Sequence, residues 1–285
     1  MIAPVDVMGC YSIHDTVQDK RLYVLVSLIL SSQTKDEINY QTMINLMINL
    51  NEEEINLYRV KYKLNKFADD SLDILISSNN TVNTYSYHKK DGRIYSNREL
   101  VITNNKLTLD NLINEKNLKD LIRPVGFHNK KYQTIKDMVE YVRRYGYPKD
   151  MQECISIKGL GRKMSLLYLN RFIEEDKDNH LSNENMNDNH SYIKKVKASN
   201  YNNIYKSAVG ISVDTHVHRI CNLLGMVKTK TPDQTSKALE EIIEKKEWGE
   251  FNNVLVGYGQ VLCMKKTPRC NDCVVKDKCT KFNIK

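Results

Sequence analysis

The chain has 285 residues, with 43 Lys and Arg against 35 Asp and Glu, for a formal net charge of +8. This excess of positive charge suits a polyanionic partner. The most apolar run, residues 22–30, is too short to cross a bilayer, and residues 1–8 lack the charged start and long apolar core of a signal peptide. Composition therefore argues against a membrane protein and predicts one or two globular domains with no membrane partner.

The N-terminal part of the chain predicts an irregular segment followed by a buried helix. Residues 1–20 contain turn formers and few periodic apolar positions, whereas 21–31 are strongly apolar. A polar turn follows and contains Gln33, for which an ordinary loop amide is the simplest interpretation. Thr34 or Asp36 is expected to cap the next helix.

Two polar stretches are interpreted as inserts, 51–105 and 174–206. Both are rich in Asn and Lys and poor in apolar residues, so we expect mostly mobile surface segments. Within the first, 64–76 has some helical periodicity. Between the inserts, the helical pattern resumes over 107–122 and a Pro-Val-Gly turn then presents Phe127. A further helix is predicted over 135–145.

The stretch from 150 to 163 predicts two helices joined by a tight hairpin. A capping-box pattern begins the first helix, and Gly159 and Gly161 permit a sharp turn. Bare N–H groups at the start of the second helix can bind a phosphate without reading sequence, and Arg162 adds positive charge. Lys163 lies in the first turn, where the helix dipole disfavours an ammonium and favours a nucleophilic amine. A solvated or phosphate-pairing lysine is the plainer interpretation.

Asp214 is expected at the start of another helix, because apolar residues over 217–224 recur at helical spacing. The simplest role for this carboxylate is that of a helix N-cap. A functional role would require it to lie near Lys163, where it could stabilise a cationic sugar or move a proton.

The C-terminal region predicts a capped helix with Pro232 at its first position, a last helix over 251–262, and a cysteine cluster. The spacing C-x6-C-x2-C-x5-C can hold a cubane iron–sulfur cluster. Zinc is the alternative metal, although structural zinc sites mostly use two short cysteine pairs and only one is present. The four candidate ligands are Cys263, Cys270, Cys273 and Cys279. Three basic residues inside the first loop could contact phosphates or simply add solubilising charge: Lys265, Lys266 and Arg269.

Taken together, the cysteine spacing, the hairpin and the motif over 213–216 resemble endonuclease III, the bifunctional DNA glycosylase/AP lyase of the helix-hairpin-helix superfamily. The stretches 28–36, 124–127 and 213–220 are most similar to the eukaryotic homologues. One position departs from the family pattern, because Lys158 stands where proline usually precedes the hairpin glycine.

The resemblance implies a role for each candidate residue. Lys163 matches the lysine that forms a Schiff base, and Asp214 matches the catalytic aspartate. Gln33 matches a glutamine that fills the gap left by a flipped base, and Phe127 falls where the family has an apolar wedge. The four cysteines match the ligands of a 4Fe–4S cluster.

The expected fold is all-α with two helical lobes. The resemblance places 21–206 in a helical barrel lobe, which includes the helix-hairpin-helix at about 150–171 and the two inserts. Residues 1–20 and 207–285 would form the iron–sulfur lobe, and DNA would lie in the cleft between the lobes.

The function implied is removal of oxidised pyrimidines in base excision repair, through a lysine Schiff base and β-elimination. The partner would be double-stranded DNA containing damaged pyrimidines or abasic sites, bound by a monomer. One alternative is a monofunctional adenine-type glycosylase, which lacks the lysine nucleophile; another is a non-enzymatic helix-hairpin-helix DNA-binding protein. A nuclear location is expected, with mitochondrial routing through a missing extension as the other possibility.

Overall fold

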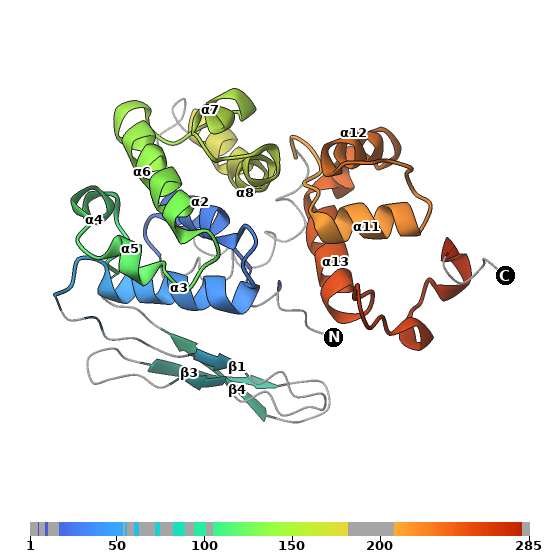
Figure 1. The fold of residues 1–285 in the computed structure, drawn as a ribbon, viewed down its shortest axis with the longest axis horizontal. Helices are drawn as coiled ribbons and strands as arrows, with labels where there is room; N and C mark the ends of the chain where they lie inside the picture. The colour runs from blue at the N-terminus through green and yellow to red at the C-terminus, as the bar shows by residue number, and fades with distance from the viewer. Residues whose placement is uncertain are drawn as a thin grey trace. The chain divides into compact units, whose positions relative to one another are not determined.

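The fold is taken from a computed structural model, which divides into two compact units, Met8–Gly146 and Met1–Val7 with Tyr147–Lys285 (Figure 1). The residues described are 5, 9–10, 17–53, 55, 60–62, 72–74, 82–88, 94–100, 105–181 and 208–280, without the side chains of the strands or of 173–181. No helix in these ranges is both long and apolar enough to span a membrane.

Helix α2 (Lys20–Ser31) is the buried centre of the first unit. Its N-terminus is capped by Asp19, whose carboxylate accepts from the Leu22 N–H at 3.0 Å. Every residue from Leu22 to Leu30 is buried, because the helix is apolar on all faces and packs against both α3 and α6. The helix predicted over 21–31 is confirmed.

Helix α3 (Asp36–Asn49) begins without the predicted cap. Its N-cap is Lys35, which makes no side-chain cap hydrogen bond, and Asp36 is already inside the helix. The Thr34 hydroxyl instead accepts a hydrogen bond from the Lys131 ammonium at 2.8 Å. The capping prediction was wrong because a residue nearly a hundred positions away competes for the threonine oxygen.

The helical stretch predicted over 107–122 is two short helices, α4 (Leu109–Asn114) and α5 (Leu118–Leu121). Asn117 interrupts it, and its side-chain amide donates to the carbonyl oxygen of Asn49 at 2.8 Å. Satisfying that buried backbone group holds the interruption in place.

Helix α6 (His128–Tyr145) is the long helix of this unit. It starts seven residues before the predicted helix over 135–145 and ends at Gly146, whose φ of 84° only glycine adopts readily. The helix packs against α2, α4 and α5, and its buried apolar side chains are Ile135, Met138, Val139 and Val142.

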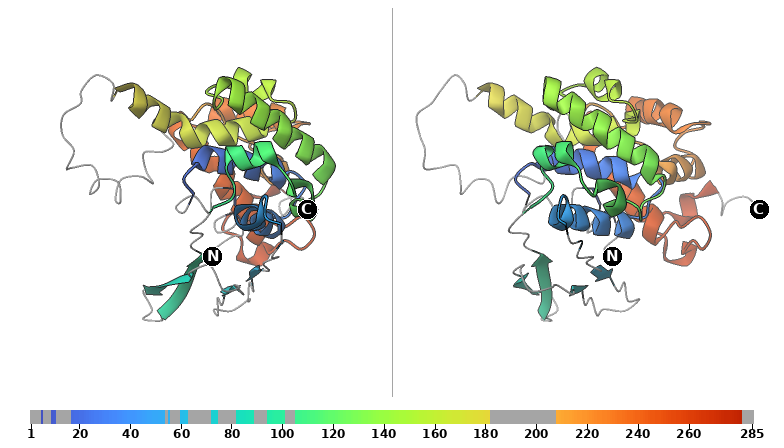
Figure 2. Two further views of the ribbon diagram at one scale, coloured as in Figure 1. Left: turned by 90° about the vertical axis from the view of Figure 1, so that its left-hand side faces the viewer. Right: turned by 60° about the vertical axis from the view of Figure 1, so that its left-hand side comes forward.

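The first insert contains strands that the sequence did not predict. Strand β1 (Val60–Tyr62) pairs antiparallel with β2 (Leu72–Ile74), and β3 (Val82–His88) pairs antiparallel with β4 (Ile94–Leu100). The views in Figure 2 draw the β3–β4 pair to one side of the helices of the same unit. Residues 72–74 are therefore strand, so the helical interpretation of 64–76 was wrong there.

The physical reason for this error lies in composition. The β3 and β4 sequences contain Val, Thr, Tyr and Ile, which favour extended backbone, but they alternate with Asn, Ser and charged residues that lower the apolar content. These strands depart from the expected all-α fold. Outside the insert, the described residues of both units form helices and no strands, and the all-α class is confirmed.

The second unit opens with α7 (Met151–Ser156) and α8 (Arg162–Leu181). The α7 N-cap is Asp150, which accepts from the Glu153 N–H at 2.8 Å, as the capping pattern predicted. Helix α8 continues to Leu181, into the predicted second insert. The remainder of that insert, 182–206, lies outside the described residues.

Three more helices lie in the described residues of this unit: α11 (Thr215–Leu223), α12 (Pro232–Ile242) and α13 (Trp248–Val261). Thr231 caps α12 ahead of the proline, as predicted. Short 3-10 turns follow α12 or lie in the cysteine region: Lys245–Glu247, Cys270–Asp272 and Lys276–Lys278. The buried core joins the three helices through Ile211, Val213, Val217, Cys221, Leu239 and Val256.

The helix-hairpin-helix groups with this second unit, whereas the predicted boundaries assigned it to the lobe formed by 21–206. Hydrogen bonds explain the grouping. Asn170 on α8 donates to Gly210 O at 2.9 Å, and Ile211 N donates to the Glu240 carboxylate on α12 at 2.9 Å. These bonds join α8, the stretch 208–213 and α12 into one body.

Candidate functional site

The hairpin between α7 and α8 is anchored by two buried apolar side chains, Ile157 and Leu160. The Leu160 N–H donates to Ile157 O at 3.0 Å and closes the turn. Gly159 has φ 96°, which a side chain would strain, so the glycine is required there. Lys158 and Gly159 are exposed, and the hairpin therefore presents its backbone to solvent.

Helix α8 starts immediately after this hairpin. A Cβ added at Gly161 would meet nothing within 4 Å, which leaves open space in front of the helix N-terminus. Lys163 is exposed in the first helical turn, as the sequence predicted. An anion can approach such a helix start without displacing protein atoms.

Arg162 has an internal partner that the sequence did not indicate. Its guanidinium lies 3.5 Å from the carboxylate of Glu240, and the side chain is about one-third exposed. The same Glu240 oxygen accepts from Ile211 N at 2.9 Å and from the Ser236 hydroxyl at 3.1 Å. Arg162 therefore helps to fix α8 on α12, and its contact with DNA stays a prediction.

Lys163 and Asp214 come from stretches that meet in the structure. The Ser212 hydroxyl donates to Lys163 O at 3.3 Å, two residues before Asp214. Asp214 caps α11, with one carboxylate oxygen accepting from the Val217 N–H at 2.8 Å. The capping interpretation is thus confirmed, and it fixes the carboxylate in orientation.

Gln33 and Phe127 lie on two turns of the other unit, and both have left-handed backbones, with φ 51° and 57°. Both side chains are exposed. The turns touch through Gly126, because a Cβ added there would lie 3.0 Å from Gln33 O. The structure therefore brings these two predicted DNA-contacting residues together.

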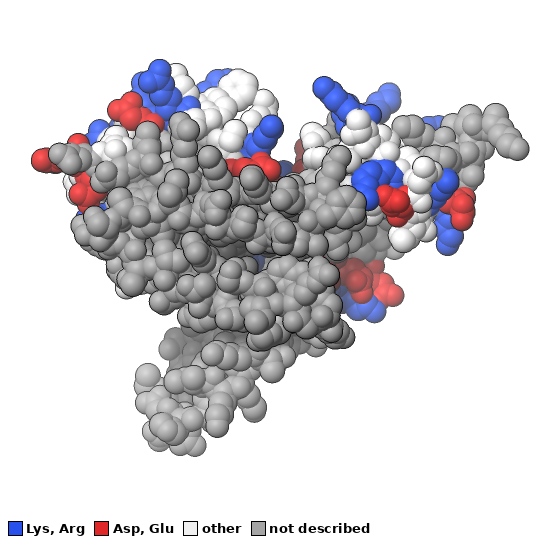
Figure 3. Space-filling model, turned by 90° about the horizontal axis from the view of Figure 1, so that it is seen from below, with Lys and Arg blue, Asp and Glu red and all other residues white. Residues whose placement is uncertain are grey.

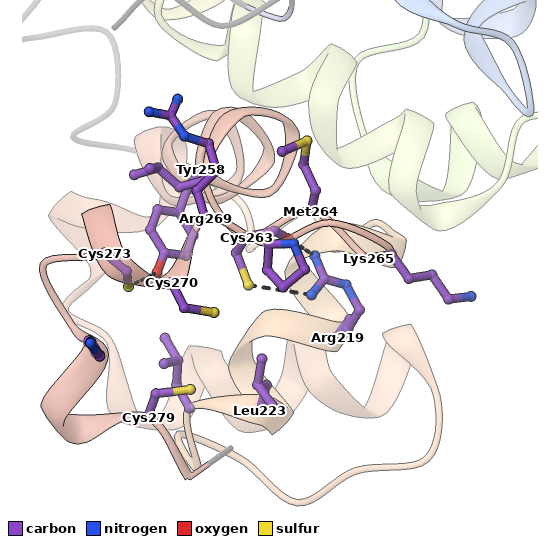
Figure 4. A pocket seen from close by; sticks show the side chains of 14 residues that line it. Arg219, Leu223, Tyr258, Cys263, Met264, Lys265, Arg269, Cys270, Cys273 and Cys279 are labelled. Carbon is purple, nitrogen blue, oxygen red and sulfur yellow. Dashed lines mark hydrogen bonds between the residues drawn. The ribbon is translucent and has the colours of Figure 1, made fainter. Parts of the chain in front are cut away.

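The four C-terminal cysteines line one cavity beside α11 and α13 (Figure 4). The Tyr258 hydroxyl lies 2.8 Å from Cys273 Sγ. Arg219 donates through one guanidinium nitrogen to Cys263 Sγ at 3.4 Å and through the other to the carbonyl oxygen of Cys263. Apolar residues complete the lining, among them Leu223, Leu262 and Pro268.

The four thiols suit a metal centre because they line one shared cavity. A cubane cluster is held by four cysteine thiolates. The donor set and the shared cavity therefore fit the ligand set of a 4Fe–4S cluster.

Comparisons with known proteins agree with this geometry. The sequence model of the HhH-GPD superfamily base excision DNA repair protein matches residues 103–245, which include the hairpin, Lys163 and Asp214. An endonuclease III homologue of Encephalitozoon cuniculi is 32% identical over 283 residues, covering 98% of this chain and 87% of that protein. The chain belongs to the HhH-GPD superfamily, as an endonuclease III homologue.

Other relatives extend the comparison to other eukaryotes. The endonuclease III homologue of Schizosaccharomyces pombe is 29% identical, covering 98% of this chain and 56% of that protein. The endonuclease III-like protein 1 of Gallus gallus is also 29% identical, with coverages of 97% and 71%.

Two solved structures show the same fold. An endonuclease III in a non-covalent complex with DNA aligns with a TM-score of 0.56 at 17% identity, over 99% of this chain and 98% of that one. A trapped covalent endonuclease III–DNA intermediate aligns with a TM-score of 0.58 at 16% identity, with the same coverages. The nearly complete coverage supports the all-α fold class, with the strands of the first insert as an addition.

Two residues of this endonuclease III homologue contact the C-terminal cysteines and could not be predicted from the sequence. Arg219 lies on α11 downstream of Asp214 and contacts Cys263, and Tyr258 lies on α13 and contacts Cys273. Burial, followed by the hydrogen bond to Cys273, raises the pKa of the Tyr258 hydroxyl, which keeps it protonated. No local sequence signal reveals either contact, because each depends on how α11 and α13 pack against the cysteine loop.

The three basic residues of the cysteine loop are all exposed, as expected for phosphate contacts or solubilising charge. Arg269 pairs with Asp272, at 2.7 Å between guanidinium and carboxylate. For Lys265 and Lys266, no ion pair is formed with the described part of the chain. On the described surface drawn in Figure 3, basic and acidic side chains are interspersed.

Proposed function

We propose that this endonuclease III homologue is a bifunctional DNA glycosylase and AP lyase that acts on oxidised pyrimidines and abasic sites in duplex DNA. The observation that carries the proposal is the contact between the start of α8, which carries Lys163, and the stretch that leads into Asp214. The lysine is exposed at the start of α8, and the Ser212 hydrogen bond joins its backbone to the stretch that ends in Asp214. An amine and a carboxylate held in this way are the two groups that a Schiff-base lyase requires.

The chemistry follows from these two side chains. The neutral Lys163 amine attacks C1′ of the sugar, a C–N bond forms, and the C1′–base bond breaks with the electron pair leaving on the base. The Asp214 carboxylate stabilises the positive charge that develops on the sugar. Ring opening gives a protonated Schiff base, which acidifies the C2′ proton. Loss of that proton expels the 3′ phosphate and cuts the strand.

Binding would use the remaining predicted contacts. The hairpin from Gly159 to Gly161 offers backbone N–H groups to a phosphate, and Gln33 and Phe127 would occupy the space left by a flipped base. The four cysteines would hold a 4Fe–4S cluster, which when bound would cross-link the loop carrying Lys265 and Lys266.

The proposal is tested by borohydride trapping on a duplex that carries one thymine glycol. Wild type should give a covalent protein–DNA adduct and Lys163→Ala should give none. The matched control is Lys237→Ala, which removes an exposed lysine from α12 and should trap as wild type does. If Lys163→Ala still forms the adduct, the nucleophile must be a residue other than Lys163.

The products of the same reactions, resolved on denaturing gels, distinguish the lyase from a monofunctional glycosylase and from a DNA-binding protein. Base release without strand cleavage or an adduct would indicate a monofunctional glycosylase. Binding without base release would indicate a DNA-binding protein only. Either result in wild type, with the duplex bound, would overturn the lyase proposal.

A further inference from the structure

Lys131 is a buried lysine on α6, with only 4% of its surface exposed. Its ammonium donates to Leu30 O at 2.6 Å, to Ser32 O at 2.7 Å and to the Thr34 hydroxyl at 2.8 Å. An ammonium has three donors, and all three are used here. Such complete pairing indicates a specific structural task, because burying a charge is otherwise costly.

The acceptors lie where a helix and a turn meet. Leu30 belongs to the last turn of α2, and Ser32 is its C-cap residue. Carbonyl oxygens at a helix C-terminus lack intrahelical partners and favour a cation. Burial lowers the pKa of Lys131 from 10.5 to about 8, which leaves the ammonium charged at neutral pH.

The Lys131 side chain forms hydrogen bonds with the turn that contains Gln33. Ser32 and Thr34 flank Gln33, and both accept from the same ammonium. Gln33 has φ 51°, a conformation that non-glycine residues adopt only when the surroundings impose it. The Gln33 side chain remains exposed, so the ammonium fixes the backbone of the turn and leaves the amide available.

The Lys131 backbone forms a hydrogen bond with the turn that contains Phe127. Its N–H donates to Phe127 O at 3.1 Å, beside the bond from Lys130 N to the same oxygen at 3.0 Å. Phe127 has φ 57° and is 58% exposed, an uncommon combination for a large apolar residue. Gly126 then abuts Gln33 O, where a Cβ would approach to 3.0 Å.

We propose that Lys131 is a positioning residue that locks the Gln33 and Phe127 turns together, so that both side chains enter the gap in damaged DNA as one unit. This inference rests on the proposed function for the consequence in DNA. The contacts that carry it are internal to the first unit and do not depend on the chemistry at Lys163.

The test is a double-mutant cycle on binding, with no chemical step. Affinities are measured for a duplex containing a tetrahydrofuran abasic analogue and for the undamaged duplex, and their ratio defines discrimination. Lys131→Met should lower discrimination roughly tenfold, the order expected for losing a charged hydrogen-bond group. In a Gln33→Ala background, Lys131→Met should cause little further loss, because it acts through the glutamine turn.

The matched control is Lys119→Met, which removes the same charge from an exposed position on α5. It should weaken binding to both duplexes equally, if at all. Losses from Lys131→Met and Gln33→Ala that multiply independently would overturn the proposal. Should Lys131→Met fail to fold, Lys131→Gln, which retains two donors, takes its place in the cycle.

A second readout separates this inference from the proposed function. Hydrogen exchange at the Thr34 amide, which donates to Ser31 O at 3.1 Å, should accelerate in the lysine variant but not in Lys119→Met. If the wild-type protein shows no preference for the abasic duplex, the proposed function is contradicted. The exchange rates would still test whether Lys131 holds the two turns together. Unchanged exchange in the folded Lys131 variant would overturn the lock itself.

Discussion

The hydroxyl of Ser212 donates to the backbone carbonyl oxygen of Lys163 across 3.3 Å and ties the start of α8 to the segment that leads into Asp214. Ser212 is buried, so Ser212→Ala removes a hydrogen bond that is shielded from water and loosens this connection. Ser212→Ala should slow base excision by about 5- to 10-fold, equivalent to about 1 kcal/mol. Single-turnover kinetics at saturating enzyme measure the excision rate. An unchanged rate would show that the Ser212 hydrogen bond does not position Lys163 and Asp214.

The two roles of Asp214 can be separated by substitution. Asn is as good an N-cap as Asp, so Asp214→Asn should keep the bond from the Val217 N–H and leave the unfolding free energy within about 0.5 kcal/mol of wild type. The missing negative charge should nevertheless reduce base excision about 100-fold or more. Asp214→Ala should lose both activity and about 1 kcal/mol of stability. Urea denaturation measures the stability of each variant, and single-turnover kinetics measure its excision rate. A fully active Asp214→Asn variant would show that Asp214 serves only as a helix cap.

Close packing at Gly210 predicts a large effect from one methyl group. An added Cβ would lie 2.7 Å from the Glu240 carboxylate oxygen and 2.9 Å from a Leu166 methyl. Gly210→Ala should therefore cost about 1–3 kcal/mol and loosen the Arg162–Glu240 pair. Gly161→Ala is the control for stability, because its Cβ would meet nothing within 4 Å. Equal melting temperatures for the two variants would refute this account of the packing.

Cys154 and Cys221 should be chemically inert in the folded protein. Burial raises the pKa of both thiols from 9.0 to about 12, so almost no thiolate exists at pH 8. Iodoacetamide at pH 8 should leave both unmodified until denaturant is added, as peptide mass spectrometry can show. Because the folded pKa is the higher one, the stability that these protonated thiols contribute is intact below about pH 9 and declines as pH rises toward 12. Rapid labelling of either thiol in native protein would contradict the burial.

The base of the first insert is closed by the helical unit itself. Lys106 N donates to Met47 O at 2.6 Å, the Lys106 ammonium pairs with Glu52 at 2.5 Å, and Asn51 N donates to the Asn117 side chain at 2.8 Å. Replacing 56–104 by a short Gly-Ser linker should therefore change the unfolding free energy by less than about 1 kcal/mol, since loop closure depends weakly on length. Differential scanning calorimetry tests this, and a variant that fails to fold would assign the insert a structural role.

Local signals predicted the local parts of this molecule. The Asp150 cap, the hairpin glycines and the Thr231–Pro232 helix start each depend on residues within four positions, and all are confirmed. The site residues with distant partners could not be found in this way. Lys131 takes acceptors about a hundred residues upstream, and Arg219 reaches Cys263, 44 positions away.

The strands of the first insert show a different limit. Their polar composition pointed to a chain without a core, and composition does not reveal that an antiparallel partner can satisfy backbone groups. The pairing of β3 with β4 is regular from Val82 opposite Leu100 to His88 opposite Ile94. Meanwhile the meeting of Lys163 with the Asp214 segment was inferred from the likeness to endonuclease III, because the intervening insert conceals it in sequence.

The contact between Gly126 and the Gln33 carbonyl has a practical consequence for protein engineering. Under the proposed function, lesion preference would be altered by randomising Gln33 and Phe127, the two exposed side chains of these turns. Any library that also varies Gly126 would place a Cβ 3.0 Å from the neighbouring backbone and spread the turns apart. A useful library therefore keeps Gly126 and Lys131 constant and varies positions 33 and 127 together. The two turns are in contact, so a side chain selected at one position depends on the backbone of the other turn.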